Sequence, residues 1–487
     1  MDGQVTLGTP AGATLEPSIC DAIESVIDKA KAKLVSLVDR FVKADVSPST
    51  TLDFEETLAA TVRELGREVE QAAFNAIEPE DPSEMPGTVT YRDRTYRRLA
   101  DKTFNREIVT PFGRIELERA SYRQGSAGRT MFPLEIALGI ETGFTPSAAD
   151  IAGRQFATAG SSQGRTIDAI NERTGAKIGN EKLRNLVRSL ATDMEPYREE
   201  CQLERVMEWI KKSRESGISP VISVSRDGVS LGIASLSSFE MASVATVSVM
   251  SDGKKLGTVY LGHAPETNQK TLTQQLTSLL KKTVKACGDV VPDIVYVTDA
   301  GKVETAYWKN VLSKFYVDGR RIKITRVVDY YHASERLTTI ANALRFGKNK
   351  QAREDWLSRM RKLLLEPDGW GRVMRSIAKM KAKYKYKSHA SDKTKDAEKY
   401  LRRYCRFMNY HALRELHYPI GSGIVESAAK QIVSERLKLS GMRWEHEGSQ
   451  NTITLRCILL SNIWREVYLR KLGQKTPVSD LITKKAA

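Results

Sequence analysis

The sequence predicts a multidomain α/β protein. Its 487 residues are too many for one ordinary domain, so about three domains are expected. Hydrophobic residues make up 41% of the chain, which is enough to form real cores. Helical periodicity fills the first part of the chain, whereas strand-like apolar runs alternate with helical ones after Pro220.

The N-terminal part predicts helices followed by strands. Residues 17–80 carry apolar side chains at helical spacing. After a proline-rich break, residues 87–124 switch to short β-prone runs, and the second run predicts a hairpin that turns at Pro111-Phe112-Gly113. We therefore expect a helical region followed by a small antiparallel sheet.

Residues 145–216 return to a helical pattern. Two short helices joined by a turn after Gly175 fit a helix-turn-helix, in which Asn180 caps the second helix. A separate polar helix is expected from about residue 195 to residue 215. The second short helix would present polar and basic side chains to DNA, namely Lys182, Arg184, Asn185 and Arg188. An ordinary basic helical hairpin is the alternative interpretation.

The next region predicts a mixed sheet. Its first apolar run reads as strand, turn and strand, with the turn at Asp227-Gly228, and a further hairpin is expected at Asp252-Gly253. Two more strand-like runs end at Asp299 and Asp329, and amphipathic helices separate them. Hairpinned strands followed by alternating helices and strands describe a mixed α/β sheet.

Residues 346–415 interrupt this sheet region with a very basic helical stretch. It contains Trp356, Trp370 and several tyrosines, including Tyr384 and Tyr386. Basic residues interleaved with aromatic ones suit a surface that grips a DNA strand, and a solvated helical face is the alternative. The sheet region resumes with a helix that carries Glu426.

These patterns divide the chain into seven parts. The expected parts are an N-terminal helical region at 1–86, a β-hairpin region at 87–144, a helix-turn-helix with its connecting helix at 145–216, the first part of the sheet domain at 217–345, the basic insertion at 346–415, the last part of the sheet domain, with Glu426, at 416–472, and a tail at 473–487.

The charge predicts a polyanionic partner. The net charge is +16 and the pI is about 9.4, which favours nucleic acid over the alternative of a membrane surface. No apolar run approaches the roughly 18 residues of a membrane span, and the N-terminus lacks the features of a signal peptide. The five cysteines are scattered and none forms a CxxC pair, so we expect reduced thiols in the cytoplasm.

Three carboxylates stand out as candidate ligands of a metal. Asp227 and Asp299 follow strand-like runs, and Glu426 follows Gly-Ser-Gly at the start of a helix. Phosphodiester chemistry uses two Mg²⁺ ions, which a few rigidly placed carboxylates can hold. Each acid also has a plain structural reading, as a turn residue or a helix-terminal charge. Asp329, which forms a DxxH pair with His332, is the alternative second acid.

Several motifs together resemble bacterial insertion-sequence transposases of the Kra type, which belong near the Mutator-like DDE transposases. The resemblance covers roughly residues 85–470. Its motifs are VVDYYHASERL, GSGIVESAAK and RLKLSGMRW, followed by LRCILLSNIW. Two departures are a DAGKVETAYW string, where relatives often have DGA followed closely by Trp, and the absence of cysteines before FPLE.

The resemblance implies an RNase H-like catalytic domain split by a helical insertion. It implies Mg²⁺-dependent cleavage at transposon ends, with Mn²⁺ expected to substitute, and joining of 3′-hydroxyls to target DNA. Carried over by position, the catalytic and metal-binding residues are Asp227, Asp299 and Glu426, while Asp329 and His332 would organise the site. The missing cysteines argue against a zinc site.

We therefore expect a DDE transposase that binds double-stranded DNA at terminal inverted repeats and at the target, as a homodimer or higher oligomer on DNA, in the bacterial nucleoid. The expected DNA-binding residues are Lys182, Arg184, Arg188, Trp370, Lys430, Arg436, Lys438, Arg443 and Trp444. An RNase H-like nuclease without strand transfer and a transposase-derived DNA-binding regulator are the alternatives.

Overall fold

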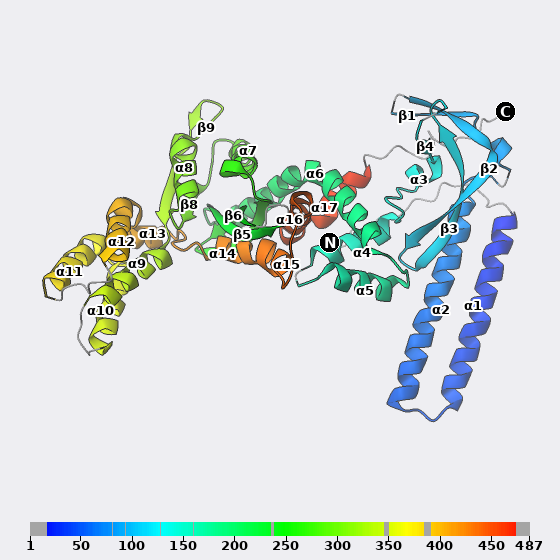
Figure 1. The fold of residues 1–487 in the computed structure, drawn as a ribbon, viewed down its shortest axis with the longest axis horizontal. Helices are drawn as coiled ribbons and strands as arrows, with labels where there is room; N and C mark the ends of the chain where they lie inside the picture. Colours follow the sequence, from blue (N-terminus) through cyan, green and yellow to red (C-terminus); the bar gives the residue numbers. More distant parts are fainter. Residues whose placement is uncertain are drawn as a thin grey trace. The chain divides into compact units, whose positions relative to one another are not determined.

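A computed structural model describes residues 17–473, except 80, 93, 127, 159, 235–237, 345–349 and 384–390 (Figure 1). The chain is a mixed α/β protein with several sheets, and it divides into two compact units. The first unit holds the described residues up to Phe156, then Ser161–Ser189 and the end of the last helix. The second holds Ala157–Gly160 and Leu190–Arg470. No helix in these described ranges combines the length and apolarity needed to cross a membrane.

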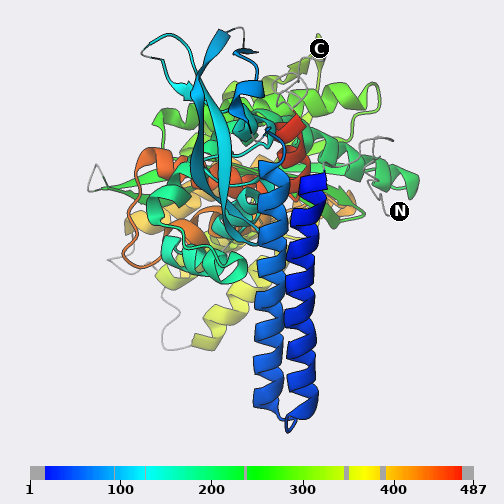
Figure 2. The ribbon, with the colours of Figure 1, turned by 90° about the vertical axis from the view of Figure 1, so that its right-hand side faces the viewer.

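The first unit begins with two long helices, α1 (Pro17–Lys43) and α2 (Pro48–Asn75), which lie side by side (Figure 2). Helical structure predicted for this region is confirmed. The Phe41 and Phe54 rings stack with their centroids 4.4 Å apart, and Lys33 bridges to Glu64 at 2.7 Å. Ser47 begins α2 with a capping box, which satisfies backbone donors at the helix start.

A four-stranded antiparallel sheet follows α2. Its strands β1 (Thr88–Tyr91), β2 (Arg94–Thr110), β3 (Gly113–Arg123) and β4 (Thr130–Met131) lie in sequence order. The predicted turn is confirmed, because Thr110 pairs with Gly113 across it. The C-terminal end of α2 covers the outer edge of β3: Gln71 accepts from the Glu116 amide and Asn75 from the Glu118 amide. A covered edge cannot pair with another chain.

Four helices follow the sheet: α3 (Pro133–Ala137), α4 (Pro146–Ala157), α5 (Gln163–Thr174) and α6 (Asn180–Glu215). Helix α5 ends at Gly175, whose positive φ of 71° suits a left-handed C-cap. Two expectations were wrong. Asn180 is the first helical residue rather than a preceding cap, and α6 runs unbroken through Pro196 instead of giving way to a new helix.

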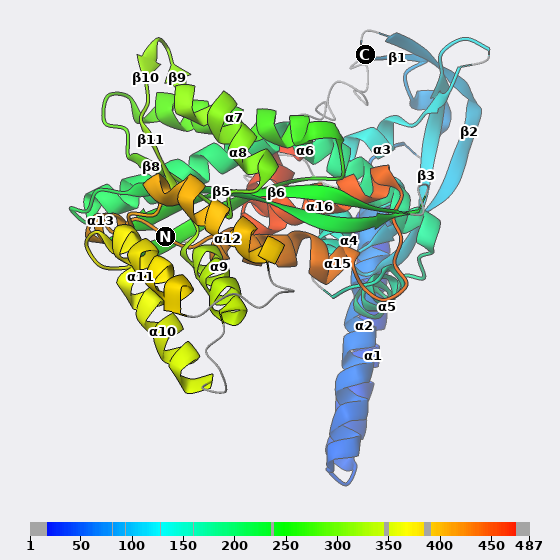
Figure 3. The same ribbon diagram turned by 60° about the vertical axis from the view of Figure 1, so that its left-hand side comes forward.

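The second unit is built on a five-stranded sheet in the order β11-β8-β5-β6-β7 (Figure 3). Strands β5 (Val221–Ile233), β6 (Ser238–Ser251) and β7 (Lys254–His263) are antiparallel, and β8 (Asp293–Thr298) and β11 (Ile324–Val328) run parallel to β5. The hairpin predicted at Asp252-Gly253 is confirmed, and both residues have the positive φ that a tight β-hairpin needs.

The turn predicted at Asp227-Gly228 was wrong. Strand β5 continues through both residues, because β6 pairs with it from Val221 to Ile233. Pairing with β8 ends earlier, at Val224. Cross-strand pairing along β6 therefore overrides the local preference of Asp-Gly for a turn.

Helices cover both faces of this sheet. Helix α6, α7 (Lys270–Cys287) and α8 (Lys302–Asn310) pack on one face. On the other face, β5 and β6 are covered by α14 (Gly423–Ala429), a π-helical turn (Lys430–Ser434), α15 (Glu435–Leu437) and α16 (His446–Leu460). The last helix is α17 (Trp464–Gly473), and a small hairpin, β9 (Tyr316–Val317) with β10 (Arg320–Arg321), precedes β11.

The interrupting segment is helical over its described residues, as predicted. Its helices α10 (Lys350–Leu363), α11 (Gly369–Lys383), α12 (Ser391–Tyr404) and α13 (Tyr410–Glu415) share one core with β8, β11 and the preceding helix α9 (Tyr330–Ala343). Trp356 is buried in this core and donates to Ser376 at 3.0 Å. The insertion therefore completes the hydrophobic core beside the sheet.

Gly257 tests how tightly α6 packs on the sheet. A methyl group at Gly257 on β7 would lie 2.2 Å from the Trp209 ring of α6. Because a rigid ring cannot yield easily, Gly257→Ala should lower the free energy of unfolding by about 1–3 kcal/mol. Chemical denaturation would measure the loss. Gly232→Ala is the matched control, since its methyl group would meet Phe239 at an ordinary 3.6 Å. Equal stability of the two variants would contradict this packing.

Candidate active site

Three aspartates lie at one level across the parallel strands. Asp227 and Asp299 each lie three residues beyond the paired residues Val224 and Tyr296. Asp329 lies one residue beyond Val328, which pairs with Thr298 next to Asp299. Neighbouring strands are about 4.8 Å apart, so this register brings the three acids to the level at which β8 and β11 end, while β5 continues to Ile233. Ends of parallel strands are where α/β proteins place their sites.

Asp227 faces the helices that follow the insertion. It shares a face of β5 with Val229 and Leu231, which pack against the cluster that contains Val425 of α14. The Gly228 amide donates to its carboxylate at 2.7 Å. Burial raises the pKa of Asp227, and the charges of Asp299 and Glu426 raise it further. The carboxylate of Asp227 therefore interacts electrostatically with both predicted partner acids.

Asp299 begins a strained turn between β8 and α8. The next residue, Ala300, has a positive φ of 65°, and the Gly301 amide donates to the Asp299 carboxylate at 2.9 Å. Two tyrosines of α12 hold this turn: Tyr400 donates to the Asp299 carbonyl at 2.7 Å and Tyr404 to the Ala300 carbonyl at 3.3 Å. The insertion thus fixes the position of the second acid.

Glu304 is a fourth acid that sequence reasoning missed. It lies in the first turn of α8 and is buried. A methyl group on Gly301 would touch both the Glu304 carboxylate and the Asp299 carboxylate, so the two acids lie beside this glycine. Burial raises the pKa of Glu304, and the charges of Asp299 and Asp227 add to the effect. The available signal was an acid one helical turn after the DAG turn.

Asp329 has a structural position. Its side chain is fully buried and accepts the backbone amides of His332, at 2.8 Å, and of Ser422. The first bond caps α9, and the second holds the Gly-Ser-Gly loop. The helix-capping alternative therefore describes Asp329 well, because both of its oxygens are already engaged.

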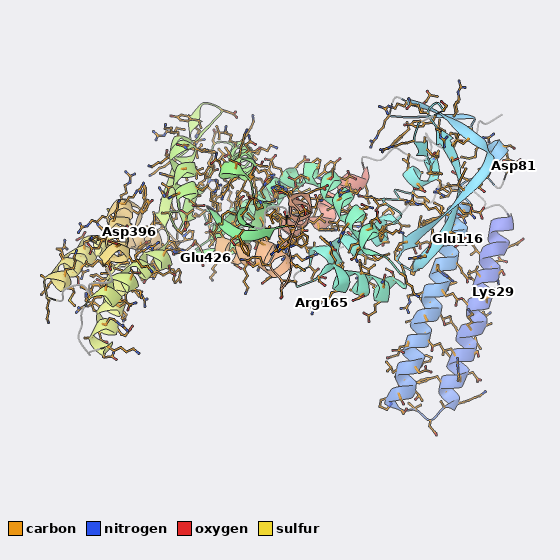
Figure 4. All side chains as sticks on the ribbon, in the orientation of Figure 1. Lys29, Asp81, Glu116, Arg165, Asp396 and Glu426 are labelled. Carbon is orange, nitrogen blue, oxygen red and sulfur yellow. The ribbon has the colours of Figure 1, made fainter. Side chains whose placement is uncertain are left out.

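Glu426 lies in the first turn of α14, with 53% of its side chain exposed (Figure 4). Ser422 donates its hydroxyl to Glu426 Oε1 at 2.7 Å, and His332 Nε2 lies 3.8 Å from the same oxygen. His332 Nδ1 lies 3.2 Å from Glu335. Glu426 thus stands between a hydroxyl donor, an imidazole and the charge of Asp227.

The chemistry of these side chains fits a hard divalent cation. Carboxylate oxygens are the ligands that Mg²⁺ prefers, and a cation would favour the ionised form of Asp227, whose pKa is raised by burial and, to a lesser extent, by the charges of Asp299 and Glu426. Within the described ranges, however, no three His, Cys, Asp or Glu side chains are gathered closely enough to hold a metal ion.

The basic residues of α6 are placed differently from one another. Arg184 and Arg188 are exposed, and Arg184 bonds to Gln163 of α5. Lys182 is half-buried, with its ammonium 5.2 Å from the centre of the Phe144 ring. Burial lowers the pKa of Lys182, and nearby arginines lower it further. Arg184 and Arg188 are thus better placed than Lys182 to meet DNA.

Two expected DNA contacts after Glu426 were wrong. Arg436 is fully buried, and burial lowers its pKa to about 10. Trp444 is buried as well and donates to the Leu437 carbonyl at 3.0 Å. Lys430, Lys438 and Arg443 are exposed, as a DNA-contacting role requires. The π-helical turn explains the error for Arg436, since its wider turns break the 3.6-residue spacing.

The aromatic residues of the insertion give a mixed result. Trp370 is half-buried and packs against the insertion core, as its structural alternative proposes. Tyr384 and Tyr386 lie outside the described residues. Trp356 belongs to the core.

Comparison with known proteins does not identify a family. No protein-family model matches the chain, and no curated protein matches it. The distinguishing chemical feature of the site is its set of carboxylates from β5, the β8–α8 turn and α14.

Asp329 should be needed for stability. Asp329→Asn replaces one acceptor oxygen by a donor that faces a backbone amide, so we expect a loss of about 2–3 kcal/mol in unfolding free energy. Chemical denaturation would measure it against Asp318→Asn, an exposed control. An unchanged midpoint for Asp329→Asn would mean that its carboxylate does not hold the loop and the helix.

Replacement of Asp227 by asparagine should raise stability at pH 7, whereas the same replacement at Asp329 should lower it. A raised pKa means that the folded state binds the proton more tightly, so stability falls as pH rises from the ordinary value of 3.8 through the raised one. Asp227→Asn removes this loss and keeps an acceptor for Gly228. Its melting temperature should exceed that of the parent at pH 7, and the difference should vanish on acidification. A variant less stable than the parent at pH 7 would contradict the raised pKa of Asp227.

Proposed function

We propose that this chain is a DDE transposase with an RNase H-like catalytic domain. The observation that carries the proposal is the placement of three acids: Asp227 on β5, Asp299 directly after β8, and Glu426 on a helix beyond an insertion, with the charges of the last two acting on Asp227. Three antiparallel strands extended by two parallel strands support the RNase H-like assignment. The DDE-type motifs in the sequence point the same way.

Asp227, Asp299 and Glu426 would hold Mg²⁺. Asp227 would be the central ligand, because its carboxylate interacts with the charges of both other acids. When bound, the metal would neutralise phosphate charge and activate the attacking oxygen. The protein's own contribution is placement. Asp329 fixes the loop before Glu426, and His332, which lies beside Glu426, would orient its carboxylate.

DNA would be held by exposed cations on both units. In the first unit, Arg165, Arg184 and Arg188 are exposed on α5 and α6, which fits recognition of terminal repeats by a helix-turn-helix (Figure 4). In the second unit, Lys430, Lys438 and Arg443 follow Glu426 on the exposed side. The chain's net charge of +16 favours such binding throughout.

The decisive test uses DNA that carries the sequences flanking the chain's own coding region. With Mg²⁺, the protein should yield nicked, excised and joined products. Asp227→Asn, Asp299→Asn and Glu426→Gln should each abolish them while leaving end binding largely intact, because phosphate contacts dominate affinity. Asp318→Asn is the matched control. Cleavage without joined product would favour a nuclease, and binding without cleavage would favour a regulator.

A second assay, together with the DNA-product assay, shows whether Asp299 or Asp329 is the second acid. With Fe²⁺ in place of Mg²⁺, iron-mediated oxidative cleavage should cut the polypeptide backbone of the parent near Asp227 and Asp299. Asp299→Asn should abolish this cutting without lowering stability. If Asp299→Asn stays active while a folded Asp329 variant is dead, the second acid is Asp329.

Lys430 and Arg436 form a matched pair for the DNA surface. Lys430→Ala should lower affinity for end DNA and flatten the plot of log affinity against log salt by about one unit. Arg436→Ala should leave that slope unchanged, because Arg436 is buried, but should lower the melting temperature. An unchanged slope for Lys430→Ala would mean that it is only a solvated surface charge.

A further inference from the structure

Besides the apolar seam between its two helices, the α1–α2 hairpin carries an apolar stripe that faces solvent. Its residues are each 48–72% exposed: Ile27, Val35, Val38 and Val42 on α1, and Leu52 and Val62 on α2. Moreover, α2 is 28 residues long, yet none of its described residues is buried. Helices obtain most of their stability from packing, so this hairpin lacks part of the burial that a lasting fold needs.

The stripes of the two helices turn toward the same side of the hairpin. On α1 the inner seam includes Leu34, Leu37 and Phe41, and the exposed residues follow these positions by one. On α2, Leu52 and Val62 likewise follow half-buried threonines by one. One residue is about 100° of helix rotation, and antiparallel helices rotate in opposite senses when viewed from one end. The exposed residues of α1 and α2 therefore lie on the same broad face of the hairpin.

The chain's own sheet uses a different part of α2. Gln71 and Asn75 bind the edge of β3, and Phe112 packs against α2 at Gly66, where a methyl group would lie 2.7 Å from its ring. Most of the stripe lies nearer the connection between α1 and α2, whereas Ile27 lies beyond the Lys33–Glu64 pair, at the end of the hairpin that carries Gln71. Exposure of its residues shows that no described part of the chain covers it.

The charges around this face argue against DNA as the occupant. Helix α2 carries six acidic and two basic side chains, in a chain whose net charge is +16. Helix α1 carries five basic and four acidic side chains, with Lys29, Lys31 and Lys33 near its middle (Figure 4). A two-fold axis along the hairpin would place each α1 against the partner's α2, so basic and acidic helices would meet.

The size of the face suits a stable dimer. Helices of this length span roughly 40 Å, and two side by side are about 20 Å wide. Contact along the whole length of the hairpin, including polar side chains beside the stripe, would approach the roughly 800 Å² per partner of a standard specific interface.

From these observations we infer that the α1–α2 hairpin is a self-association element: a second copy of this chain covers the stripe and forms an antiparallel four-helix bundle. The association needs no DNA, so it is independent of the proposed function and goes beyond it. It assigns the N-terminal helices to pairing of subunits instead of recognition of DNA ends.

Sedimentation velocity of the full chain without DNA tests this inference. The parent should be a dimer at micromolar concentration. Val35→Glu combined with Val38→Glu should raise the dimer dissociation constant roughly a hundredfold or more, because charges would be buried in an apolar interface. Val35→Leu with Val38→Leu should stay dimeric, and so should Val290→Glu, which alters an exposed valine of the second unit. A monomeric parent, or a dimeric Glu variant, would overturn the inference.

Cross-linking gives an answer even if the Glu variant fails to fold. Val38→Cys treated with a bis-maleimide should give a covalent dimer, whereas Val290→Cys and the parent, with its five native cysteines, should give only background. Equal yields from Val38→Cys and Val290→Cys would refute the hairpin as the contact.

Discussion

The candidate site depends on one buried carboxylate. The Asp329 carboxylate accepts the amide of His332, in the first turn of α9, and the amide of Ser422, and its own amide donates to the Thr298 carbonyl at 2.9 Å. The next amide, of Tyr330, donates to Ile420 at 2.9 Å. A single residue thus joins β8, β11, α9 and the loop that leads to Glu426. Since a buried acceptor must be satisfied, these partners are held together strongly.

The insertion contributes to this framework from its own side. Three of its tyrosines donate to carbonyls at the strand ends: Tyr400 to Asp299, Tyr404 to Ala300 and Tyr410 to Val328. Residue Ala300 has left-handed backbone geometry, which persists only where surrounding contacts impose it. Aromatic residues that suggest base stacking in the sequence therefore include several whose hydroxyls position the site.

Sequence reasoning succeeded where local patterns decide the outcome. Apolar spacing predicted α1, α2 and the helical insertion, and Asp252-Gly253 predicted a hairpin. The same dipeptide at Asp227-Gly228 failed, because its strand is paired on β6 throughout and no turn is possible there. The aspartates were found as strand-end acids, but their common level needs the register of strands far apart in the chain. Buried Arg436 and the acid Glu304 depend on packing that no local pattern contains.

The acids differ in what their surroundings ask of them. Both oxygens of Asp329 are satisfied by backbone amides, so this framework is complete within the protein itself. Asp227 is destabilised as a carboxylate by burial and by neighbouring acids, which is the opposite condition. Burial is the larger cause of the raised pKa of Asp227, and the charges of Asp299 and Glu426 add to it. The two aspartates thus contribute to the fold with opposite sign: hydrogen bonds to Asp329 join strands, helix and loop, while the ionised form of Asp227 is held at a cost.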